Sequence, residues 1–123
     1  MVQSVSIAPP HSVVLVTGRD AKGVIPDSMR GGLIVATDSC IAVGCRSDAD
    51  GPTGFVLGRT PEIGANGNEP MFEGLLDTPT REVVVQTVEG QTILAAQVPT
   101  TKTIVRIWVN DALEPDRVLI GLG

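Results

Sequence analysis

The stretch 81–109, REVVVQTVEGQTILAAQVPTTKTIVRIWV, decides the fold class of this chain. It is rich in valine, isoleucine and threonine, the residue types that favour strands. Glu89-Gly90 divides its first part into two runs of strand-forming residues, so a hairpin is predicted over 81–97. The run 102–109 predicts a third strand, and Trp108 within it is expected to be a core residue.

Similar short runs continue on both sides of this stretch, separated by turn residues. Further strands are predicted over 2–7, 12–17, 33–37, 40–46, 53–57, 71–76 and 117–120. The chain is therefore predicted to be an all-β, two-sheet β-sandwich of about 8–10 short strands, with a small β-barrel as the alternative. No run has a helical period long enough to supply the crossover helices of an α/β fold. With 123 residues, it is predicted to form a single domain over 1–123.

Two features of this pattern leave questions for the tertiary structure. The segments 18–32 and 58–70 are rich in glycine and proline and are predicted to be loops, the first with a short helical turn at 27–30. The 58–70 loop is long, and long loops are either functional or mobile; the sequence does not decide which applies here. Strands such as 83–85 are apolar at consecutive positions, which predicts that a loop or another copy of the chain covers their outer face.

The charge of the chain narrows the kinds of partner it can have. The net charge of −5 comes entirely from residues 61–123, and the chain has only three large aromatic residues. Negative charge repels phosphates, and few aromatic rings means few platforms for stacking bases, so nucleic-acid binding is disfavoured. An acidic half either steers a basic protein partner or simply keeps the chain soluble.

The cysteines and the apolar runs bear on the compartment. Cys40 and Cys45 lie in one predicted strand, five residues apart, which is too far for a disulfide and places them on opposite faces. Free thiols suit a reducing compartment, so a cytoplasmic location is expected. Residues 1–10 do not form an export signal, and no run is long enough for a membrane helix, so no membrane association is expected.

Three groups of residues are candidates for chemistry, and each has an ordinary structural explanation. His11 is the only histidine, so a Ser-His-Asp or Cys-His mechanism would depend on it. The motif at 48–51, Asp-Ala-Asp-Gly, resembles a calcium loop without the EF-hand spacing, and turn-forming aspartates explain it equally. The third group consists of three carboxylates spaced by four residues, Glu69, Glu73 and Asp77. Paired carboxylates are the catalytic groups of glycosidases, and solvent-exposed surface acids explain this spacing equally. No metal and no cofactor are predicted.

The last third of the chain carries a resemblance to a known family. The run at 81–85, the Glu89-Gly90 turn and the Trp-bearing strand at 103–110 resemble the closing strands of the competence-J family, small β-sandwiches that act as nuclease inhibitors. The resemblance also includes overall size and acidity. It implies a sandwich fold and a protein-binding inhibitor role, and no inhibitory residue of the family is matched onto this chain.

The sequence therefore favours a non-catalytic, protein-binding domain of the inhibitor or immunity type. It would present an acidic surface to a basic protein partner. The candidate binding residues, which fall at predicted strand ends, are Asp77, Asp111, Glu114 and Asp116. The alternatives are a self-assembling structural or accessory domain that forms a homo-oligomer, and a small enzyme that uses carboxylates or His11.

Overall fold

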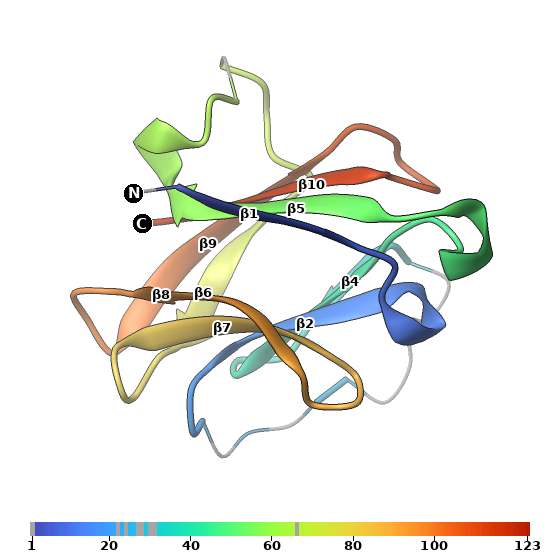
Figure 1. The fold of residues 1–123 in the computed structure, drawn as a ribbon. Helices are drawn as coiled ribbons and strands as arrows, with labels where there is room; N and C mark the ends of the chain where they lie inside the picture. The colour runs from blue at the N-terminus through green and yellow to red at the C-terminus, as the bar shows by residue number, and fades with distance from the viewer. Residues whose placement is uncertain (1, 22, 24, 27–28, 30–31, 66) are drawn as a thin grey trace.

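The computed structural model of the chain contains ten strands in two sheets of five (Figure 1). It describes residues 2–21, 23, 25–26, 29, 32–65 and 67–123. Among these residues there are also three single 3-10 turns, at Pro10–Ser12, Asp48–Asp50 and Thr60–Glu62. None of the helical segments among these residues is long and apolar enough to cross a membrane.

The first sheet has the strand order β1-β5-β10-β9-β6. Its strands are β1 (Gln3–Ile7), β5 (Thr53–Arg59), β10 (Arg117–Leu122), β9 (Lys102–Val109) and β6 (Phe72–Asp77). β5 and β10 run parallel, and the other neighbours in this sheet run antiparallel. A parallel pair brings the starts of both strands to the same end of the sheet, which positions the loops described below.

The second sheet has the strand order β3-β4-β2-β7-β8 and is antiparallel throughout. Its strands are β3 (Ile34–Ala36), β4 (Cys40–Gly44), β2 (Val13–Gly18), β7 (Glu82–Thr87) and β8 (Thr92–Gln97). The predicted hairpin over 81–97 is confirmed as β7 and β8. Its turn is closed by the amide of Gly90, which has a φ of 91° and donates to the carbonyl of Thr87 at 2.9 Å.

The core lies between the two sheets and follows strand alternation. The inward residues form one apolar cluster that includes Val14, Val16, Ile41, Val43, Phe55, Leu57, Leu76, Val83, Val85, Val105, Ile107, Val118 and Ile120. The two sheets do not join into one, and single hydrogen bonds link them at their edges. The Gln3 side chain donates to the Ala95 carbonyl at 2.6 Å, and the Asp77 amide donates to the Asp38 carbonyl at 2.8 Å. The all-β, two-sheet prediction is confirmed, and the barrel alternative is wrong.

The outer face of the second sheet explains the strands that are apolar at consecutive positions. Leu15, Cys40 and Ala42 form a second buried cluster on that face, against which Val13 and Met29 pack. Met29 belongs to the segment between β2 and β3, so a loop supplies at least part of the predicted cover. The helical turn expected at 27–30 falls mostly outside the described residues.

On the outer face of the first sheet, residues from a loop cover the side chain of Trp108. This side chain is buried as predicted, and its indole Nε1 donates to the carbonyl of Asn68 at 2.8 Å. A Cβ at Gly121 would lie 3.0 Å from the indole ring and 2.8 Å from the Thr60 hydroxyl, so this position requires glycine. Thr60 and Asn68, both in the 58–70 segment, therefore lie against Trp108 on the outer face of the sheet.

Two neighbouring leucines test the register of β6. Leu76 is 0% exposed and Leu75 is 60% exposed, since they face opposite sides of the sheet. We expect Leu76→Ala to lower the free energy of unfolding by about 2–5 kcal/mol, because it leaves a cavity in the core. Leu75→Ala should change it by less than about 0.5 kcal/mol. Urea unfolding at low protein concentration measures both, and equal effects would contradict this register.

Candidate partner-binding surface

The structure brings together three of the four predicted binding residues. Asp111, Glu114 and Asp116 lie in the loop 110–116, which joins β9 to β10. Asp77 is the last residue of β6 and pairs with Lys102, the first residue of β9. It therefore lies at the opposite end of β9 from the other three, and one compact contact surface does not include all four.

Asp77 also differs from Asp111 and Glu114 in its electrostatic environment, because it has a cationic partner. Its carboxylate accepts a hydrogen bond from Lys102 Nζ at 3.0 Å, and this bond raises the pKa of the lysine. Glu73 has the same relation to Arg106, and this pair lies four residues away from the first on each strand. The acids of β6 are thus offset by the cations of β9.

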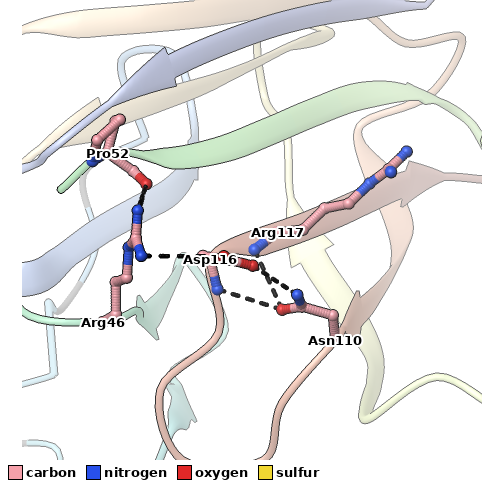
Figure 2. A network of polar contacts seen from close by, with 5 residues as sticks. All are labelled: Arg46, Pro52, Asn110, Asp116 and Arg117. Carbon is pink, nitrogen blue, oxygen red and sulfur yellow. Dashed lines mark hydrogen bonds and ion pairs between the residues drawn. The ribbon is translucent and has the colours of Figure 1, made fainter. Parts of the chain in front are cut away.

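The loop 110–116 is closed by the side chain of Asn110 (Figure 2). The Asn110 Nδ2 group donates to the Asp116 carboxylate, and its Oδ1 accepts from the amides of Asp116 at 3.2 Å and Arg117 at 3.1 Å. One amide side chain therefore joins the two ends of the loop. The guanidinium of Arg117 points away from this network.

A second carboxylate shapes the inside of the loop. Asp111 Oδ1 accepts hydrogen bonds from the amides of Leu113 at 2.8 Å and Glu114 at 2.9 Å. These two bonds stabilise the carboxylate and lower the pKa of Asp111. Leu113 is 82% exposed, so the loop presents an apolar side chain between acidic ones.

Arg46 attaches this loop to a second one, residues 46–52. Its guanidinium donates twice to the carbonyl of Pro52, at 3.2 and 2.7 Å, and lies 3.9 Å from the Asp116 carboxylate (Figure 2). Its amide donates to the carbonyl of Pro115 at 3.0 Å. Because side chain and backbone both contribute, the two loops are held as one surface.

The loop 46–52 adds two further carboxylates. Asp48 and Asp50 lie on a 3-10 turn that is capped by the Ser47 hydroxyl, and the Asp48 amide donates to the Ser12 hydroxyl at 3.2 Å. We call loops 46–52 and 110–116, together with Arg117 at the start of β10, the acidic end. It carries the carboxylates of Asp48, Asp50, Asp111, Glu114 and Asp116 and the guanidinium groups of Arg46 and Arg117.

The charge of the acidic end is mostly uncompensated. Of its five carboxylates only Asp116 is in an ion pair within the part of the chain that the structure describes. The acidic end therefore differs from the β6 strand, where Asp77 and Glu73 each have a cationic partner. Leu113 and Arg46 also belong to this surface, and neither was among the binding residues predicted from the sequence. An apolar residue between acids was a readable signal for Leu113, whereas nothing in the sequence places Arg46 beside Asp116.

The other candidates for chemistry have simpler surroundings. His11 is exposed in the turn Pro10–Ser12, with a φ of 60°. Over the described ranges, no three His, Cys, Asp or Glu side chains gather as a metal site. Cys40 and Cys45 are free and buried in different clusters, and burial raises the pKa of the Cys40 thiol to about 11. Their opposite faces were predicted correctly.

The fold of two five-stranded sheets is similar to that of solved structures of other small proteins. One is ComJ from Bacillus subtilis, described as an inhibitor of the DNA degrading activity of NucA. It matches with a TM-score of 0.67 and 14% identity, over 99% of this chain and 93% of ComJ. Another is the product of crocagin biosynthetic gene J, with a TM-score of 0.53, 11% identity, and 99% and 96% of the two chains covered.

The solved structures are similar to this chain in fold, although their sequences are only distantly similar. The resemblance inferred from the last third of the chain is confirmed, and it extends over nearly the whole fold. No family model matches the chain, and no curated protein sequence matches it. At this level of identity the likeness concerns the fold alone.

The closure of the loop by Asn110 can be tested directly. We expect Asn110→Ala to lower the free energy of unfolding by about 1 kcal/mol, because it removes the bonds that join the loop ends. Hydrogen exchange at the amides of Asp116 and Arg117 should accelerate. Asn68→Ala is the control, since Asn68 is exposed and bonds Trp108 through its main-chain carbonyl. Unchanged exchange at both amides in Asn110→Ala would contradict the assignment.

The lowered pKa of Asp111 predicts how the loop responds to acid. The carboxylate form is favoured in the folded state, so its contribution to stability is present above the unfolded-state pKa and is lost as pH falls through the lower folded pKa. The Leu113 and Glu114 amide signals should titrate by NMR with a midpoint below the ordinary aspartate value. Asp111→Asn, which keeps an oxygen acceptor, should remove this transition. A midpoint at or above the ordinary value would contradict the prediction.

Proposed function

We propose that this protein binds and inhibits a basic protein partner, and that the acidic end is its contact surface. The observation that carries the proposal is a set of carboxylates without ion-pair partners in the described chain, on loops that are held in place. Charges left uncompensated in the free protein are available to a cationic surface. The role is one of binding, and no catalytic residues are proposed.

The held geometry of the loops favours tight association. Ordering a flexible loop on binding costs free energy. The hydrogen bonds of Asn110, Asp111 and Arg46 already order these loops in the free protein, so less conformational entropy is lost on binding. Leu113 at the loop tip supplies an apolar contact surrounded by charge. Apolar anchors ringed by polar groups are the usual arrangement of energetically important interface residues.

A nuclease is the class of target that we propose. ComJ, which shares the fold, is described as an inhibitor of a DNA-degrading activity. An enzyme that binds DNA presents cations to phosphates, and the acidic end offers carboxylates to the same cations. The negative charge that disfavours nucleic-acid binding by this chain thus favours binding to a protein that handles nucleic acid. We place this encounter in the cytoplasm, which suits the free thiols.

Charge reversal at Glu114 tests the proposal. Glu114 is exposed, and its side chain holds none of the hydrogen bonds that shape the loop, so Glu114→Lys leaves the network of Asn110 and Asp111 in place. The wild-type chain, immobilised, is expected to retain a basic protein from its own organism's lysate at low salt and release it at high salt. Glu114→Lys should bind that protein about tenfold more weakly.

Glu89→Lys is the matched control, because it makes the same change in net charge on the exposed β7–β8 turn. It should bind as the wild type does. The captured protein is then assayed for nuclease activity with and without the wild-type chain, and inhibition is expected. Equal weakening by the two variants would show that only net charge matters and would reject the acidic end as the contact surface. A captured protein with no nuclease activity would reject the proposed target class.

A further inference from the structure

The outer face of the β6–β9 ladder has an ordered charge pattern that the acidic end does not use. Three successive cross-strand pairs face outward there: Asp77 with Lys102, Leu75 with Ile104, and Glu73 with Arg106. The first and third are ion pairs, and the middle one is apolar. We call these six residues the outer ladder.

The apolar centre of the outer ladder is open to solvent. Leu75 is 60% exposed and Ile104 is 39% exposed, although they are neighbours on one face. The covered part of this sheet is elsewhere, over Trp108, where Asn68 and Thr60 lie. Two large aliphatic side chains framed by charges form an uncovered patch at the edge of the sheet.

The charges of the outer ladder are sorted by strand. The outward acids, Asp77 and Glu73, both lie on β6, and the outward cations, Lys102 and Arg106, both lie on β9. The face thus has a negative column beside a positive column, with one aliphatic residue at the middle of each. A surface with this pattern is complementary to itself after one particular rotation.

We propose that a second copy of this chain docks on the outer ladder, face to face, about a two-fold axis parallel to the strands. This rotation exchanges the two columns, so that β6 of each copy lies over β9 of the other. Each carboxylate then faces a cation of the partner copy at the same level, and each leucine faces an isoleucine. Contacts of this isologous kind close a dimer instead of building a fibre.

The charge pattern also selects this axis over the other face-to-face choice. A two-fold axis perpendicular to the strands would lay β6 over β6 and β9 over β9. Asp77 would then face Glu73, and Lys102 would face Arg106, which sets like charges together on both strands. Aligned sheets pack face to face at angles near 30°, so the favoured arrangement is a normal sheet packing.

The dimer goes beyond the proposed function and does not depend on it. An axis parallel to the strands leaves the acidic ends of both copies uncovered and at the same end of the dimer. Six residues from each copy make a small interface, so the association is weak, with a dissociation constant on the order of 10–100 μM.

Sedimentation equilibrium over a range of protein concentrations measures the association. The wild type should dimerise, and Leu75→Glu should weaken the dimer at least about tenfold by placing a charge in the apolar centre. Leu113→Glu is the control, because Leu113 is even more exposed but lies outside the outer ladder, and it should not change the association. A wild type that remains monomeric up to about 1 mM would overturn the proposal.

A charge swap tests the geometry itself. Asp77→Lys with Lys102→Asp keeps the ion pair within each chain and keeps two swapped chains complementary to one another. A swapped chain against a wild-type chain sets lysine over lysine and aspartate over aspartate. Swapped chains should therefore form their own dimers, whereas mixed dimers, counted by native mass spectrometry with an isotope-labelled wild type, should fall below the statistical share. Mixed dimers at the statistical share would overturn the proposed axis.

Discussion

The parallel pairing of β5 with β10 is the constraint on which the candidate site depends. Phe55 and Val118 are partners in this ladder and are fully buried, so the apolar core fixes the register. Because the two strands run in the same direction, the loops that precede them, 46–52 and 110–116, must lie at the same end of the sheet. A shift of one residue would turn the whole apolar row of either strand outward, so the position of the acidic end is tied to burial in the core.

The same acidic composition has two different physical meanings in this molecule. On the β6–β9 ladder, Asp77 and Glu73 each have a cation across the strand pair, so these charges largely cancel outside the ladder. At the acidic end, hydrogen bonds from main-chain amides stabilise Asp111 without cancelling its charge. Net charge alone cannot distinguish these cases. The distinction decides which acids are free to attract a partner and which order a surface.

Residues from two irregular segments cover part of the outer faces of the sheets. The 58–70 segment lies over Trp108, and the segment before β3 contributes Met29 to the outer face of the second sheet. Among the strand residues that the structure describes, only those of the outer ladder include large aliphatic side chains exposed on a sheet face. Uncovered apolar area on a sheet is unfavourable in water, which is why we assign a partner to this face and none to the covered ones.

The sequence by itself determined the strands, the two-sheet class and the opposite faces of Cys40 and Cys45, because strand alternation and turn chemistry are local properties. It also located three acids of the acidic end, since Asp111, Glu114 and Asp116 are close in the chain. Tertiary structure alone decided that Asp77 stands apart and that Arg46 holds Asp116. These facts depend on which strands become neighbours and in which direction they run, and non-local pairing leaves no signature in a single sequence.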